Sequence, residues 1–313
     1  MKKIFRPIIV AIMLLGLVSQ QVYAIDTTAI NEKWGKPTVV YGGGLNDQQI
    51  KETSKLLGIK DENTVTTTKA TGEDLVKYLG AGEANTSVMI SSVMVQKRNK
   101  GEGVKVHIAT PKNITLVTSE QYANAAITAG VADAEIEVAA VSKVTGESAL
   151  SGVYKAFEAN GVVLDGKRTA VAQKELELTN QIAQEQAKEK GFDAAKLDQA
   201  MIDIKKTLAE IKEKQGQVAT KEDVERIVNE ALKKYGLDKV ISPTQVNNII
   251  QFALSYQQTS AIDSKQVLEQ LNSLSNNVKG KIGQLVDQAN REGWLDKIVT
   301  FFKEIFNAIF SSK

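Results

Sequence analysis

The sequence predicts an α+β fold, in which an N-terminal mixed α/β domain, a sheet covered by helices, precedes an all-α helical bundle. Three observations predict it. Up to residue 165, short β-branched runs alternate with helix-like segments. After Asp165 those runs nearly disappear, and apolar residues follow a helical spacing. The chain has 313 residues, 42% of them hydrophobic, which is enough for two cores. We therefore expect a mixed α/β domain at 25–165 and a helical domain at 166–313.

The first 24 residues resemble an export leader. A positively charged start is followed by an apolar run at residues 8–18, and small residues precede a cleavage position after Ala24. The apolar run is shorter than the about 20 residues that a membrane-spanning helix needs. We therefore expect a signal peptide at 1–24 and a secreted, extracellular protein that is associated with the cell envelope.

Charge and cysteine content exclude several functions. Without the leader the chain has 36 Lys and Arg residues against 37 Asp and Glu residues, and neither half is strongly basic. Nucleic-acid binders need clustered cations, so we expect no nucleic-acid partner. The chain has no cysteine, which excludes disulfides, thiolate catalysis and the usual structural zinc sites.

Strands are expected where β-branched residues gather and helices where a capping residue precedes an apolar face. The expected strands lie at 38–41, 64–68, 87–96, 104–109, 113–118 and 135–141. Expected N-caps are Asn46 or Asp47, Thr71 and Ser119, and the expected helix stops are Gly80, Gly130 and Gly161. The polar segment 97–103 suggests a hairpin loop. Glu135 and Glu137 alternate with apolar residues, which predicts a strand with one wet face.

The second half reads as several amphipathic helices. Residues spaced four and three apart form a heptad seam, and they are Leu197, Met201, Ile204, Leu208 and Ile211. A helix is expected after Thr220, another begins near Pro243, and a further one follows Val267. These seams fit either an intramolecular bundle or an intermolecular coiled coil, and glycines that interrupt them favour the bundle.

The last helix, 294–310, is unusually rich in aromatic residues. Charged residues interrupt it, so it is not a membrane span. It either closes the bundle or contacts a membrane surface or a partner groove. The contact residues would be Trp294, Ile298, Phe301, Phe302, Ile305 and Phe306.

Catalytic patterns are scarce. The triplet Gly42–Gly44 follows a strand but lacks the residues of a phosphate loop. His107 is the only histidine, and strand alternation places it on the solvent side, which argues against a serine triad or a multi-histidine metal site. Four glutamates could pair for glycoside cleavage, and they are Glu135, Glu137, Glu147 and Glu158. We expect no catalytic residue, no metal and no cofactor, and a cell-wall hydrolase that uses these carboxylates stays open as an alternative.

Three stretches resemble the signatures of one family. Residues 86–92 read T-S-V-M-I-S-S and are similar to its T-S-A-I-S-S signature. Residues 126–134 read A-I-T-A-G-V-A-D-A and are similar to A-L-x-T-A-G-V-x-D-A, and residues 145–152 read T-G-E-S-A-L-S-G and are similar to S-G-T-A-A-L-T-G. The chain thus resembles the exported proteins of Gram-positive bacteria grouped as domain of unknown function 1002, the YpuA-like family. The resemblance implies an exported, envelope-associated protein and supplies no catalytic residues.

These signatures read first as backbone devices, with a binding cleft as the alternative. The cleft would be lined by Thr86, Ser87, Ser91, Ser92, Thr145, Gly146, Ser148 and Ser151. The expected function is a secreted, non-enzymatic binding protein whose partner is an envelope component or another protein. A membrane-surface protein docked by its last helix is a further alternative.

Overall fold

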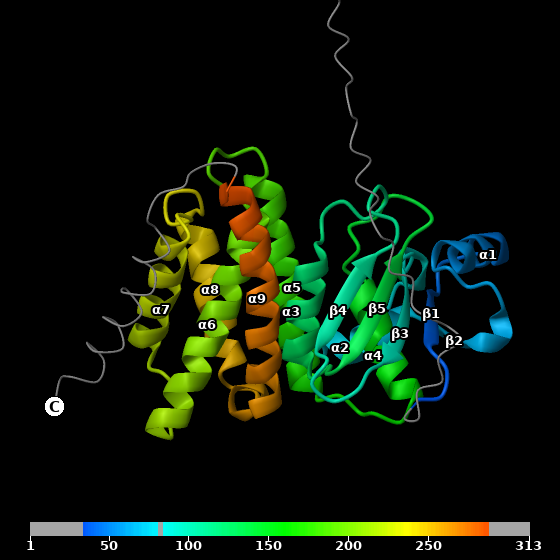
Figure 1. Ribbon diagram of the computed structural model, residues 1–313, viewed down its shortest axis with the longest axis horizontal. Helices are drawn as coiled ribbons and strands as arrows, with labels where there is room; N and C mark the ends of the chain where they lie inside the picture. The colour runs from blue at the N-terminus through cyan, green and yellow to red at the C-terminus, as the bar shows by residue number, and fades with distance from the viewer. Residues whose placement is uncertain (1–33, 81–83, 288–313) are drawn as a thin grey trace, which may run out of the picture.

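The computed structural model describes residues 34–80 and 84–287 and forms a mixed α/β fold (Figure 1). Its strands are β1 (Thr38–Gly42), β2 (Thr66–Ala70), β3 (Ser92–Lys97), β4 (Val104–Ile108) and β5 (Ala134–Ala139). Its helices are α1 (Asp47–Leu56), α2 (Gly72–Leu79), α3 (Ser119–Ala129), α4 (Ala149–Ala159), α5 (Gly166–Gln186), α6 (Ala194–Gln215), α7 (Lys221–Lys234), α8 (Pro243–Tyr256) and α9 (Lys265–Asp287). The expected signal peptide and the expected helix 294–310 lie outside the described residues.

The sheet has the strand order β2-β1-β3-β5-β4. β2, β1, β5 and β4 run in one direction, and β3 runs against its neighbours β1 and β5. The expected hairpin at 97–103 is wrong, because β5 lies between β3 and β4 and pairs with both. β5 is covered on both faces in this place, as the burial of Ile136 on one face and Ala139 on the other shows.

Two other expected strands differ from the structure. β3 begins only at Ser92, and residues 86–88 form a short 3₁₀ turn instead of extended chain. Segment 113–118 is not a strand, and its contact with a neighbour is one isolated bridge between Ile114 and Val144. Thr118 ends this segment as the N-cap of α3, one residue before the expected cap.

Helix ends follow local chemistry closely. Asn46 and Thr71 each form a capping box with the third residue of the helix that follows. Gly80 and Gly130 end their helices in the left-handed conformation, as glycine allows without strain. Pro243 opens α8 at its first turn.

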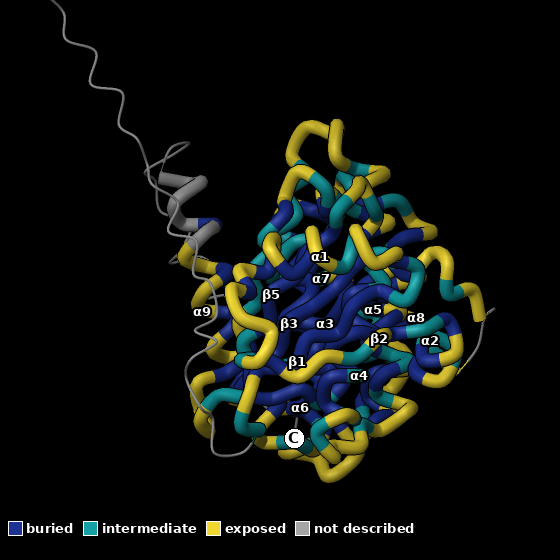
Figure 2. The backbone as a smooth tube through the Cα atoms, turned by 90° about the vertical axis from the view of Figure 1, so that its right-hand side faces the viewer, coloured by how far each residue is buried: buried dark blue, intermediate teal, exposed yellow. Residues whose placement is uncertain are grey.

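The two faces of the sheet meet different apolar layers. One face contributes Val40, Val93 and Ile136 to the largest hydrophobic cluster, which continues through α3 and α4 into the later helices. The opposite face contributes Val39 and Met94 to a smaller cluster with the α1 region. The expected wet face of β5 is wrong at Glu137, which is 2% exposed. Figure 2 shows the buried backbone passing through strands and helices alike, with exposed loops around it.

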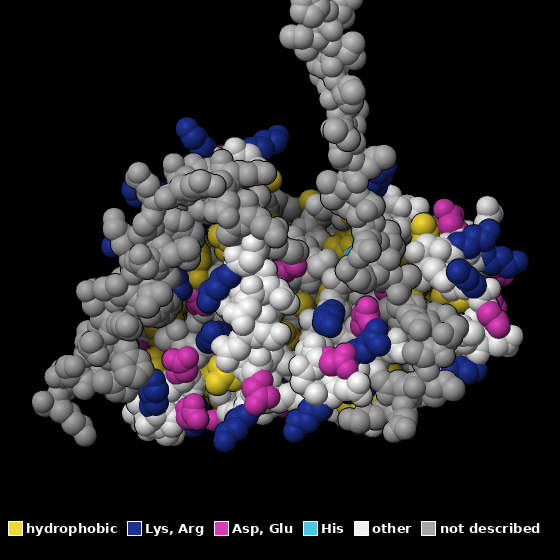
Figure 3. Space-filling model, viewed as in Figure 1, with side chains coloured by type: hydrophobic (Ala, Val, Ile, Leu, Met, Phe, Trp, Pro, Cys, Tyr) yellow, Lys and Arg dark blue, Asp and Glu magenta, His cyan; other side chains and the backbone are white. Residues whose placement is uncertain are grey.

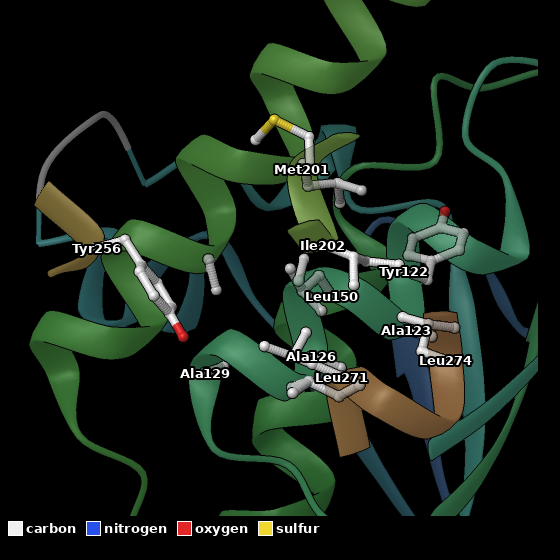
Figure 4. Close-up of a cluster of buried hydrophobic side chains, with 14 of the residues drawn as sticks. Tyr122, Ala123, Ala126, Ala129, Leu150, Met201, Ile202, Tyr256, Leu271 and Leu274 are labelled. Carbon is white, nitrogen blue, oxygen red and sulfur yellow. The ribbon is translucent and has the colours of Figure 1, made fainter. Parts of the chain in front are cut away.

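The later helices pack in the pairs α5–α8, α6–α7, α6–α9 and α7–α8. All five residues of the expected α6 seam are buried. Asp165 is the N-cap of α5, and the largest cluster holds residues from both sides of it. Figure 4 shows residues of α3, including Ala126, beside Ile202 of α6 and Leu271 of α9. The domain boundary at 165 stays a prediction.

A fully buried ion pair lies where α3, α5 and α6 meet. Lys205 Nζ of α6 is 2.7 Å from Glu175 Oε1 of α5, and both side chains are almost without exposure. The ammonium also donates to Asn124 Oδ1 at 2.6 Å and to Thr128 Oγ1 at 2.9 Å, both on α3. Thr128 in turn donates to Glu175 Oε2 at 2.6 Å. Burial raises the pKa of Glu175 and lowers that of Lys205, and each charge offsets the shift of the other.

Candidate functional site

The four parallel strands end at one edge of the sheet, called here the carboxyl edge. Ligands of open α/β sheets bind outside this kind of edge. β3 runs the other way, so segment 86–91, which leads into it, begins at the carboxyl edge. Segment 145–148, which follows β5 and leads into α4, adjoins the same edge. Both halves of the expected cleft therefore lie beside the place where the fold favours a ligand.

Segment 86–92 is held against glycines by close backbone contacts. A Cβ on Gly42 would overlap Met89 O, and one on Gly44 would lie 2.6 Å from Ser87 O. Thr86 Oγ1 accepts a hydrogen bond from the backbone N–H of Gly72 at 3.0 Å. Ser92 Oγ accepts one from Gly42 N–H at 3.1 Å. Thr86 and Ser92 therefore position the backbone, and the glycine triplet is a packing surface for this segment.

The tip of the same segment is open. Ser87 is exposed, and its hydroxyl donates to Asn85 Oδ1 at 2.7 Å. Val88 is 56% exposed, although its neighbour Met89 is fully buried. The result is an exposed turn with an apolar tip on a rigid base, called here the 86–88 turn.

Segment 145–152 also combines packing residues with open ones. Gly146 has a φ of +95°, and its carbonyl accepts from Tyr122 OH at 2.6 Å. Thr145 is exposed and Ser148 half-buried, and Ser148 makes no capping bond with its side chain. Ser151 is buried without a hydrogen-bond partner for its hydroxyl, and so is Ser91, which directly precedes β3.

The signature at 126–134 is structural. Thr128 belongs to the network around Lys205, and Gly130 ends α3. Asp133, with a φ of +48°, accepts hydrogen bonds through Oδ1 from the N–H groups of Gly101 and Gly103 at 2.9 and 3.0 Å. These residues order the loop between β3 and β4 and contribute no open side chain to the carboxyl edge.

His107 and Glu137 form a pair that the sequence reasoning missed. His107 Nδ1 is 2.8 Å from Glu137 Oε2, and the two residues are opposite each other on β4 and β5. Glu137 Oε1 is buried without a hydrogen-bond partner. Burial raises the pKa of Glu137, and the bond with His107 partly offsets that rise. The sequence shows a histidine and a glutamate on two expected strands, but only the pairing of β4 with β5 brings the two side chains together.

The pKa direction predicts how Glu137 affects stability. The pKa of Glu137 is raised in the folded chain, so at pH values between its ordinary pKa and its raised pKa the folded chain keeps a proton that the unfolded chain has released. The free energy of unfolding therefore falls as the pH rises through this range. We expect Glu137→Gln to flatten the decline of unfolding free energy between pH 5 and 8, measured by urea titration. Glu52→Gln, on exposed α1, is the control. An unchanged pH slope in Glu137→Gln would contradict this prediction.

The four glutamates considered for hydrolysis do not meet at one place. Glu135 pairs with Arg98, and Glu147 accepts from Asn180 Nδ2 at 2.5 Å. Glu158 pairs with Lys77 and accepts from Tyr78 OH at 2.5 Å. Only Glu135 and Glu137 share a strand face.

The described part of the chain offers few other sites. It contains no group of three or more His, Cys, Asp or Glu residues that could hold a metal ion. None of the helices described is both long and apolar enough to cross a membrane. A groove of about 300 Å³ between α5 and α8 is lined mainly by exposed polar side chains, among them Lys174, Glu177 and Gln251. Figure 3 shows cations and anions intermixed over the face it presents.

These features define a mixed α/β protein built on a five-stranded sheet of mixed direction. The family model described as a protein of unknown function (DUF1002) matches residues 41–274, and the chain belongs to this family. It is similar to the uncharacterized protein YpuA of Bacillus subtilis (strain 168), with 30% identity over 320 residues that cover 99% of each chain. No solved structure matches the chain.

Proposed function

We propose that the protein is an exported, non-enzymatic binding protein of the cell envelope. The leader pattern at 1–24 supports export. A non-enzymatic role is supported by three of the glutamates considered for hydrolysis, because each carboxylate already has a polar partner. They are Glu135, Glu147 and Glu158. The ligand is an envelope component or a protein, and nucleic acid is not expected because the charges are balanced.

The 86–88 turn is the observation from which we locate the binding surface. The 86–88 turn presents exposed Ser87 and Val88 at the carboxyl edge, on a base that glycine contacts hold in place. An exposed apolar side chain on a rigid base loses little conformational entropy when it is buried by a ligand. Thr145 and Ser148 supply polar groups near the same edge.

The helices α5–α9 have a supporting role in this proposal. They form a helical bundle whose seams are filled within the chain, as the burial of Leu197, Ile204 and Leu208 supports. The bundle meets the sheet part through α3 and fixes it against α5, α6 and α9. The binding surface is thus carried by the sheet and stabilised by the bundle.

Co-sedimentation tests the proposal. The chain from residue 25 is expected to pellet with purified Gram-positive cell walls and not with lipid vesicles. Val88→Lys should reduce the pelleted fraction several-fold, because a cation replaces the apolar tip, while the melting temperature stays unchanged. Val163→Lys is the matched control, since Val163 is 90% exposed on the loop before α5.

Two outcomes would contradict the proposal. Equal pelleting of Val88→Lys and Val163→Lys would remove the 86–88 turn from the binding surface. Pelleting with vesicles alone, lost on deletion of residues 294–310, would favour a membrane-surface protein.

One observation favours a second candidate, hydrolysis by carboxylates. Glu135 and Glu137 lie two residues apart on one strand face, which separates their backbones by about 7 Å. Glu137 has a raised pKa, and Glu135 is paired with Arg98, an asymmetry that an acid and its partner carboxylate require. Incubation of cell walls with wild type, Glu135→Gln and Glu137→Gln tests it. Release of soluble wall fragments by the wild type, but by neither variant, would support hydrolysis and contradict the non-enzymatic proposal.

A further inference from the structure

Strand β4 is at the end of the sheet. Among residues 34–80 and 84–287 it pairs with β5 alone. Ala109 N–H donates to Val138 O, and Gly103 O accepts from Ala134 N–H. Alternate residues of a parallel strand bond to the same neighbour, so every second residue of β4 directs its N–H and C=O groups outward. Those residues are Val104, Val106 and Ile108.

The side chains of β4 divide into two kinds by face. Lys105 is exposed and His107 half-buried on one face, while Val106 and Ile108 are half-buried on the other. An outer strand would therefore meet Lys105 and His107 on one face and an apolar strip on the other. A partner that fits has acidic and apolar residues in alternation.

The inner edge of β4 already pairs with such a sequence. β5 reads Ala-Glu-Ile-Glu-Val-Ala, and its register sets Glu135 opposite Lys105 and Glu137 opposite His107. Glu135 is bound by Arg98, and Lys105 has no ion pair among the described residues. The charge of Lys105 is thus available to a strand on its outer side.

We propose that the outer edge of β4 binds an extended peptide segment with alternating acidic and apolar residues, which adds to the sheet as a further strand. Strand addition supplies main-chain hydrogen bonds through Val104, Val106 and Ile108, and Lys105 supplies the charge preference. A second copy of this chain fits less well, because two β4 edges would set Lys105 and His107 against Lys105 and His107, without an acidic partner for either lysine. This partner is independent of the cell-wall ligand proposed above, so the two proposals fail separately.

The first test uses the protein unchanged. The probe is a fluorescein-labelled peptide with the β5 sequence, Ala-Glu-Ile-Glu-Val-Ala, capped at its far end as an amide, and the readout is fluorescence anisotropy in low salt. We expect saturable binding that weakens at least about tenfold when the isoleucine and valine amides are N-methylated, since methylation removes strand hydrogen bonds. A peptide with lysines in place of both glutamates should bind about tenfold more weakly.

The second test exchanges the charges. Lys105→Glu should weaken the acidic peptide about tenfold and strengthen the lysine peptide, a reversal that misfolding does not produce. Val106→Pro should abolish binding of both peptides, because proline removes an outward N–H and is tolerated on edge strands. Circular dichroism and the melting temperature confirm that both variants fold.

Three results would overturn the inference. One is an absence of saturable binding by the acidic peptide to the wild type. Another is equal binding of the N-methylated and unmodified peptides. The third is that neither peptide binds and that light scattering shows a concentration-dependent dimer, which Val106→Pro abolishes. That result would assign the edge to a second copy of the chain.

Discussion

Lys205→Met is expected to lower the free energy of unfolding by about 3–5 kcal/mol. The substitution keeps the volume of the stem but leaves Glu175 buried without its cation. It also leaves the Asn124 carbonyl and side-chain oxygens without their shared donor. Buried acceptors that lose a partner keep the full cost of desolvation. Urea titration at pH 7 measures the loss.

A double variant separates the pair from its surroundings. Lys205→Met with Glu175→Leu removes both charges, and it should recover most of the stability, since replacement of a buried ion pair by apolar residues is often neutral. The single variant should also be less stable at pH 8 than at pH 5. Burial raises the pKa of Glu175 even beside Lys205, so without the lysine the folded state favours the protonated carboxyl still more.

The opposite pattern would contradict this account. If the double variant lost as much stability as the single one, the contribution of Lys205 would come from packing and not from charge. If Lys205→Met had an unchanged unfolding free energy, the ion pair would have no net role at the junction of α3, α5 and α6.

Gly42→Ala is expected to cost about 3 kcal/mol or to prevent folding. The new Cβ would overlap the carbonyl of Met89, and backbone atoms of Met89 and Ile90 surround the position. Backbone cannot rotate away as a flexible side chain does, so β1 and the segment leading into β3 would have to separate. The same shift would loosen the 86–88 turn. Thermal and urea unfolding measure the loss.

Gly166→Ala is the matched control. Gly166 begins α5, has nothing within 4 Å of its added Cβ and does not have a positive φ. Its unfolding free energy should stay within about 0.5 kcal/mol of the wild type. Equal losses in the two variants would show that the cost belongs to glycine itself and not to the contact with Met89.

The sequence predicted the features that depend on neighbouring residues. The caps Asn46 and Thr71 and the stops Gly80 and Gly130 are confirmed, because each depends on hydrogen bonds within one turn. The α6 seam is confirmed for the same reason, since its spacing is local. The family assignment, made from three short stretches, is confirmed by the match over residues 41–274.

The features that depend on distant residues were not predicted. Nothing near 97–103 indicates that β5, some thirty residues later, enters between β3 and β4. α5 gave no clear apolar stripe, because its buried face includes Thr169, Gln173 and Glu175. Glu175 has its partners on other helices, Thr128 of α3 and Lys205 of α6, and Thr169 donates to Tyr78 O of α2, contacts that the sequence of α5 does not reveal.

The candidate site shows the same division. Gly146 belongs to a signature that was interpreted first as a backbone device, and its close contact with Tyr122 agrees with that interpretation. The openness of Ser87 and the burial of Ser91 and Ser151 could not be read from their identity, because serine is common in both settings. Whether these residues bind a ligand stays a prediction.

The contacts that α9 makes with Asp133 and with α3 affect the order in which the protein folds. Asp133 N–H donates to Gln270 Oε1, and Ala123 and Ala126 of α3 are buried beside Leu271 and Leu274 (Figure 4). A ribosome that has released only the first half of the chain leaves that alanine surface of α3 open to water. Burial of that surface then waits for α9, so the unfinished chain exposes apolar side chains of the kind that chaperones bind.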